Sequence, residues 1–207
     1  MARAERTRER ILEAAAELIS EEGIDEVRIA RVANRARVST SLVHHYFSTR
    51  EELLADALLL AFELAARERI GSERPGPDAT WTVSLAIAIE QSLPEVRHER
   101  EWVLWVELWL RAAREPELRP VSARLYESYR DWLVRLLEGG IAAGEFETAD
   151  PGRVADLALG LFDGLGLRVL LEDLPLDRAR ALIAENLAPE LGLEPEALNV
   201  DIEPAQR

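Results

Sequence analysis

The sequence predicts an all-α protein, with a three-helix helix-turn-helix domain at the N-terminus and a larger helical domain after it. Apolar residues recur with helical spacing along most of the chain, and β-type alternation is nowhere sustained. Prolines and glycines stand at the ends of these periodic stretches. The 207 residues are 48% hydrophobic, which is enough to build a core in more than one domain.

Three N-terminal helices are expected in succession. The first covers residues 3–22, where an apolar stripe runs until Gly23 ends the helix. Short second and third helices cover residues 28–36 and 39–46, and Ser39 can cap the third. Helices this short, joined by a tight turn, are typical of a helix-turn-helix.

A long fourth helix is expected over residues 49–70. Ser48 or Thr49 can cap it, and Glu51 and Glu52 lie in its first turn, where the helix dipole favours acids. After a loop at 71–77, further helices are expected at 78–93, 96–114, 117–143, 152–171 and 176–188, with prolines at their ends.

These elements predict three segments. Residues 1–50 form the helix-turn-helix domain, with the motif at about 28–47. Residues 51–190 form a second helical domain. Residues 191–207 form an acidic, Pro-containing tail, a composition typical of a segment that frays.

Charge is distributed unevenly along the chain. The net charge is −14, but residues 1–50 hold nine arginines and eight acids, whereas residues 51–207 hold 16 and 31. Between Arg28 and Arg50 there are five arginines and no acid. A short stretch of this kind can arise by chance. As a basic island on an acidic protein, it attracts a polyanion to one face and repels it elsewhere.

Several classes of protein are disfavoured. The absence of cysteine excludes disulfides and thiolate metal sites. Neither an apolar stretch long enough for a membrane span nor a signal-peptide pattern is visible, so a cytoplasmic location is expected. No common catalytic motif occurs, and no two acids fall together in an apolar stretch, so we expect no enzyme.

The segment from Ile29 to Leu54 carries the function. Its apolar positions are spaced to close a small core, and they are Ala33, Val38, Val43 and Phe47. Ser39, Thr40 and Ser41 fall at the start of the third helix, where free N–H groups and hydroxyls can meet phosphates and base edges. The third helix can lie in the major groove of DNA.

Residues 6–54 resemble the N-terminal domain of TetR-family regulators. The matching positions are Arg8, Ile11, Leu12, Ala14, Ala15, Ala33, Ala36, Val38, Ser39, Val43, Tyr46, Phe47 and Leu53. Two positions depart from the family pattern. Arg37 replaces the usual turn glycine, so the turn must avoid a strongly positive φ or absorb strain. His44 replaces a tyrosine that contacts phosphate.

The resemblance implies roles for individual residues. It assigns Thr40, Ser41 and His45 to base edges, and Arg28, His44, Tyr46 and Arg50 to phosphates. For Tyr46 and Phe47, core packing is the alternative. His44 and His45 diverge by about 100° on a helix and suit one metal ion poorly, so no metal or cofactor is expected. A dimer would bind a palindromic site, and the logarithm of its affinity would fall against log salt with a slope of about −5 to −7.

The same resemblance implies an effector-binding second domain. Candidate pocket residues are Trp102, Trp105, Trp109, Tyr129 and Trp132, with Glu90 and Asp163 as lone acids in uncharged stretches. An aromatic core and helix-edge acids are the alternatives; as a pocket, the site would take an apolar or cationic effector. Residues 102–166 are also loosely similar to the choline-responsive betaine-pathway subgroup. Glu107 is expected to be solvated beside Arg111.

The helix at 152–171 is apolar almost all round and must be covered on every side. Leu157, Gly160, Leu161 and Gly164 are therefore predicted to meet a second copy in a four-helix dimer bundle formed with 176–188, and burial within a monomer is the alternative. The function expected is a repressor released from a palindromic operator by a small molecule. A helical enzyme or a protein-only adaptor is the alternative.

Overall fold

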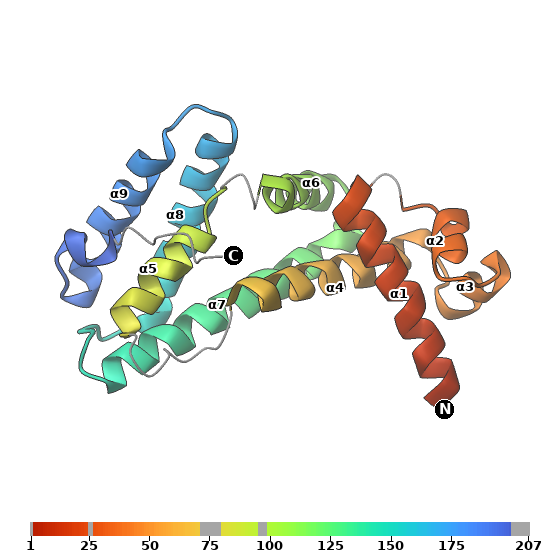
Figure 1. Ribbon diagram of the computed structural model, residues 1–207, viewed down its shortest axis with the longest axis horizontal. Coiled ribbons are helices and arrows are strands. Elements are labelled where there is room, and N and C mark those ends of the chain that lie inside the picture. The colour runs from red at the N-terminus through yellow and green to blue at the C-terminus, as the bar shows by residue number, and fades with distance from the viewer. Residues whose placement is uncertain (1, 25–26, 71–79, 95–98, 200–207) are drawn as a thin grey trace, which may run out of the picture. The chain divides into compact units, whose positions relative to one another are not determined.

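The computed structural model describes residues 2–24, 27–70, 80–94 and 99–199. In this part of the chain there are nine α-helices and no strand, which confirms the predicted fold class (Figure 1). The α-helices are α1 (Ala2–Glu22), α2 (Ile29–Arg35), α3 (Thr40–Tyr46), α4 (Arg50–Ile70), α5 (Trp81–Gln91), α6 (Glu99–Arg114), α7 (Arg119–Ala142), α8 (Pro151–Leu170) and α9 (Leu176–Leu187). The loop expected at 71–77 lies outside the described residues.

The chain divides into two compact units. The first, here called the head unit, comprises Met1–Arg69 and Val103–Tyr126. The second, the body unit, comprises Ile70–Trp102 and Glu127–Arg207. Apolar side chains from α6 and the start of α7, including Leu108 and Leu125, are buried in the same core as the N-terminal helices. Packing therefore groups α4 with α1–α3, although the sequence predicts that residues from 51 onward belong to the second domain.

Local side-chain bonds fix the helix-turn-helix elements. Ser39 Oγ accepts from Leu42 N at 3.2 Å and begins α3 as predicted. Thr49 Oγ1 accepts from Glu52 N at 3.0 Å and caps α4 in the same way. Each hydroxyl satisfies a backbone N–H that has no partner inside its helix.

The turn between α2 and α3 absorbs strain. Arg37 has φ +54°, in the left-handed region. Val38 N donates back to Ala33 O at 2.9 Å and so closes the end of α2. The turn therefore keeps the backbone of a glycine although an arginine occupies it. A left-handed residue other than glycine costs about 1–2 kcal/mol.

Glycines in the body unit admit aromatic rings. A Cβ on Gly139 would lie 2.2 Å from the Trp81 ring, and one on Gly140 would lie 2.1 Å from the Phe146 ring. Both glycines are on α7, so Trp81 of α5 and Phe146 close directly on its backbone. The core of this unit comes mainly from α5, α7, α8 and α9.

The C-terminal tail is partly packed rather than frayed. Leu191 and Leu198 are buried in the body unit, each within a short 3-10 helix. Glu147 N donates to Leu191 O at 2.9 Å, which fixes the first of these turns. The expectation of fraying is therefore wrong up to Asn199, because apolar side chains spaced along the tail reach the core; residues 200–207 lie outside the described part. None of the described helices combines the length and apolarity that a membrane crossing needs.

Candidate nucleic-acid interface

One face of α3 is buried and the other is exposed. Val43 and Phe47 have no exposed surface and anchor the helix to the core of the head unit. Ser39, Thr40, Ser41, His44 and His45 are all exposed. Ser41, His44 and His45 lie away from the Val43 stripe, whereas Ser39 and Thr40 are exposed at the N-terminal end of the helix. Ser39 Oγ and Ser41 Oγ lie 2.9 Å apart. Small hydroxyls and imidazoles therefore make up much of the exposed surface of α3.

Tyr46 and Phe47 take different positions. Phe47 is fully buried, with the Arg8 guanidinium 5.0 Å above its ring centre, as its core interpretation predicted. Tyr46 is half-buried and makes an edge contact with His45, with 5.3 Å between ring centres. Tyr46 thus steadies the His45 ring and still reaches the surface.

The two arginines assigned to phosphates differ in their exposure and in their hydrogen bonds within the protein. Arg28 precedes α2, is exposed, and makes no ion pair with any described residue. Arg50 is half-buried, and its Nε donates to Val27 O at 2.8 Å. One donor of Arg50 therefore binds the carbonyl of Val27, and its terminal amino groups form no hydrogen bond with a described residue.

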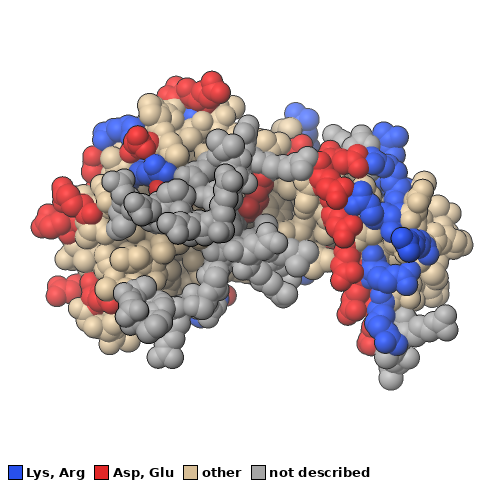
Figure 2. Space-filling view, viewed as in Figure 1, with Lys and Arg blue, Asp and Glu red and all other residues tan. Residues whose placement is uncertain are grey.

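The basic island of the sequence is partly neutralised in space. Arg31 pairs with Glu22 at 2.6 Å. Arg35 pairs with Glu21 at 2.7 Å and with Glu17 at 3.2 Å, and these hydrogen bonds, that to Glu21 first, raise the pKa of Arg35 above its ordinary value. The acids come from the outward face of α1, and Figure 2 shows acidic and basic side chains in adjacent stripes. The basic island is therefore weaker in space than a count of charges within residues 28–50 predicts, because its partners lie on another helix.

The head unit contains an aromatic cluster that includes two predicted pocket residues. Trp105 of α6 lies 4.3 Å from Phe62 of α4, 5.9 Å from Tyr126 of α7 and 6.1 Å from Trp109, measured between ring centres. Trp105 and Trp109 are half-buried. Phe62 was not among the predicted residues, because only tertiary packing brings α4 beside α6.

The other predicted pocket residues belong to the body unit. Trp102 is 6% exposed and lies directly on Gly166 of α8, where a Cβ would be 2.2 Å from its ring. Tyr129 and Trp132 meet edge to face with 6.5 Å between centres. Trp102 therefore fills a gap against α8 and packs as a core residue.

The two candidate acids of the body unit are both half-buried. Glu90 accepts from Arg180 Nε at 2.6 Å and thereby joins α5 to α9. Asp163 lies on α8. The ion pair gives Glu90 a structural partner, which agrees with the helix-edge interpretation.

The expectation that Glu107 is solvated beside Arg111 is wrong. Glu107 is half-buried, and its carboxylate accepts from Ile24 N at 3.4 Å, next to the turn at Gly23. Arg111, its expected partner, pairs with Glu115 at 3.6 Å. The turn after α1, with Gly23 at φ +92°, directs a backbone N–H at α6, and the carboxylate satisfies it.

The predicted interface glycines on α8 lie open. Gly160 and Gly164 are exposed, and a Cβ built on either would meet nothing within 4 Å. Leu157 and Leu161 beside them are half-buried. The described residues of this chain therefore leave the glycine face of α8 available to another molecule.

Comparison with known proteins agrees with this geometry. Residues 11–57 match the family "Bacterial regulatory proteins, tetR family", and residues 81–192 match "BetI-type transcriptional repressor, C-terminal". The chain is 27% identical over 196 residues to the HTH-type transcriptional regulator BetI of Cronobacter sakazakii, covering 89% of this chain and 90% of that protein.

Solved structures show the same fold. A putative TetR-family regulator from a Rhodococcus species has a TM-score of 0.68 at 27% identity, covering 86% of this chain and 94% of its own. A putative regulator from Saccharomonospora viridis, solved in complex with choline, has a TM-score of 0.64 at 26% identity, covering 87% and 95%.

Proposed function

The chain belongs to the TetR family of bacterial transcriptional regulators with a BetI-type C-terminal domain, and from this premise we propose that it is a homodimeric repressor released from a palindromic operator by a small apolar or cationic effector. DNA-binding regulation is the function of the family, and its members are not enzymes. Neither the enzyme nor the protein-only adaptor is therefore favoured.

The exposed face of α3 carries the proposal for DNA. Thr40, Ser41 and His45 are proposed to contact base edges, because all three are exposed on α3, Thr40 and Ser41 in its first turn and His45 near its end. The proposed phosphate contacts come from Arg28, Ser39, His44, Tyr46 and Arg50. Arg28 offers a complete guanidinium, whereas Arg50 offers only its terminal amino groups.

Selection of bound sequences from a random DNA pool tests this function. A palindrome with half-sites about one helical turn apart is expected. Replacing Thr40, Ser41 or His45 with alanine should weaken binding to the selected duplex by about 5- to 100-fold and leave binding to a mixed-sequence duplex unchanged. Ser20→Ala, an exposed serine on α1, is the control. Recovery of no common sequence would contradict the proposal.

The open glycine face of α8 supports dimerisation. Gly160 and Gly164 let a second helix approach closely, and each costs about 1 kcal/mol in a helix interior. Leu171 at the end of the same helix is 68% exposed. An exposed face of this composition in a family that typically dimerises is what a subunit interface requires.

The dimer proposal is tested by sedimentation. Gly164→Arg places a long charged side chain on the open face and should yield monomers that no longer bind the palindrome. Ala142→Arg, on the exposed last turn of α7, should remain dimeric. A dimeric Gly164→Arg variant would place the interface elsewhere.

The aromatic cluster of the head unit supports effector control. A cation or an apolar ring inserted beside Trp105 would contact Phe62, and Phe62 lies on α4, which follows α3 along the chain. Displacement of α4 would change the spacing of the two recognition helices, provided that the effector binds the released form more tightly. The choline complex of the Saccharomonospora protein makes choline the first effector to try.

Tryptophan fluorescence tests the effector site. Choline and larger hydrophobic amines should quench or shift the emission and lower the affinity for the selected duplex. Trp105→Leu should abolish both effects, whereas Trp81→Phe, in the body unit, should retain them. Unchanged emission with every amine would leave the aromatic cluster as core.

A further inference from the structure

The strained turn places an arginine beside the recognition helix. Arg37 holds φ +54° and is exposed, two residues before the cap of α3. Glycine would adopt this backbone without strain. The arginine side chain makes no ion pair with any described residue, so no internal contact accounts for it.

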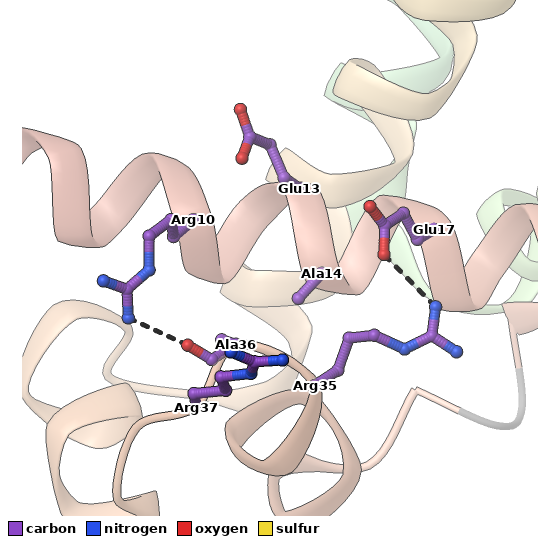
Figure 3. Close-up of a pocket in the computed structure, with 7 residues that line it drawn as sticks. All are labelled: Arg10, Glu13, Ala14, Glu17, Arg35, Ala36 and Arg37. Atoms are coloured by element: carbon purple, nitrogen blue, oxygen red, sulfur yellow. Dashed lines mark hydrogen bonds and ion pairs between the residues drawn. The ribbon is translucent and has the colours of Figure 1, made fainter.

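A hollow of about 460 Å³ opens between α1 and this turn (Figure 3). Arg10, Arg35 and Arg37 contribute to its lining. A second hollow of about 470 Å³ shares Arg10 and extends to Leu42 on α3. The hollows therefore lead from the turn to the recognition helix within the head unit.

Three arginines line the first hollow together with two glutamates, Glu13 and Glu17, which leaves one net positive charge. Arg35 is neutralised by Glu17 and Glu21. Arg10 donates to Ala36 O at 2.8 Å, which fixes its guanidinium beside the turn without cancelling its charge. Neither Arg10 nor Arg37 forms an ion pair with a described residue.

We propose that Arg37 and Arg10 together bind a backbone phosphate of the operator, a contact that the family pattern does not supply because a glycine usually occupies the turn. A guanidinium presents paired donors that match phosphate oxygens. Arg10 is held in place by the Ala36 carbonyl, and Arg37 is carried on a turn that the fold fixes. This inference rests on the proposed DNA-binding function.

The Arg37→Gly variant should change DNA affinity and thermal stability in opposite directions. It should remove the backbone strain at residue 37 and raise Tm by about 2–4 °C. It should also weaken binding by about 10- to 100-fold at 0.1 M salt and reduce the salt slope of the dimer by about 2. The probes are the selected palindrome and a mixed-sequence duplex of equal length, and both should lose affinity equally because phosphates carry no sequence information.

Three further variants complete the test. Arg37→Asn tolerates the left-handed backbone and should reproduce the loss of slope, whereas Arg37→Lys should retain the slope. Arg124→Ala removes an exposed arginine elsewhere in the head unit and should leave the slope unchanged. A wild-type slope in Arg37→Gly would overturn this inference alone. A wild-type protein that binds neither duplex would overturn the proposed function with it.

Discussion

Substitution of Gly166 with alanine tests how the body unit is packed. The added Cβ would lie 2.2 Å from Cη2 and 2.3 Å from Cζ2 of Trp102. Trp102 is only 6% exposed, so its rigid ring has little space into which to move. Either the ring or α8 must shift by more than 1 Å to reach an ordinary contact of about 3.5 Å.

The expected cost follows from two opposing terms. Overpacking a buried site costs about 1–3 kcal/mol, and this contact falls at the upper end because both partners are rigid. Alanine in place of glycine inside a helix returns about 1 kcal/mol. The net loss in free energy of unfolding should therefore be about 1–2 kcal/mol, or roughly 2–8 °C in Tm.

Urea unfolding of a double-mutant cycle measures this contact. Gly166→Ala should be destabilising in the wild-type background. In a Trp102→Leu background the clash is removed, and the same change should stabilise by about 1 kcal/mol. A Gly166→Ala protein as stable as wild type, with no coupling to Trp102, would refute the proposed packing.

Three other substitutions have defined outcomes. Burial raises the pKa of Glu145, but hydrogen bonds from the first backbone N–H groups of α5 and from Thr82 Oγ1 outweigh it, so the net pKa is lowered. The ionised Glu145 carboxylate therefore stabilises the folded protein fully above the ordinary Glu pKa of about 4.3, and this stabilisation is lost as the pH falls through the lowered pKa. The difference in the free energy of unfolding between wild type and Glu145→Gln should then vanish in acid. A difference that does not depend on pH would argue against the cap. Phe47→Ala leaves a cavity at a fully buried site and should lower the free energy of unfolding by about 3–5 kcal/mol, measured by heat or urea, with loss of DNA binding. Near-wild-type stability would contradict the burial of Phe47 in the core of the head unit. Glu107→Ala leaves Ile24 N without its carboxylate acceptor and should speed amide exchange at Ile24, whereas Glu138→Ala on α7 should not; equal exchange in both variants would exclude the contact.

The helices of the head unit could be predicted because their signals are local. Ser39 and Thr49 each place a hydroxyl three residues before a free backbone N–H, and the structure forms both bonds. The apolar spacing of Val43 and Phe47 predicts their burial, and both have no exposed surface. Periodicity and capping act over a few residues, so the sequence contains them directly.

Contacts between distant segments could not be predicted in this way. Arg31 and Arg35 form ion pairs with acids on α1 only because α2 packs beside that helix. The half-buried position of Glu107 depends on a backbone N–H presented 83 residues earlier in the chain. Such pairings are set by tertiary distance, so a charge count along the sequence assigns them wrongly.

The crystal structure of the protein bound to its selected duplex tests the central claim most directly. We expect two α3 helices in successive major grooves, with Thr40, Ser41 and His45 within hydrogen-bonding distance, about 3.5 Å, of base edges. A complex in which these three side chains face solvent or protein, while another surface contacts the DNA, would contradict the account.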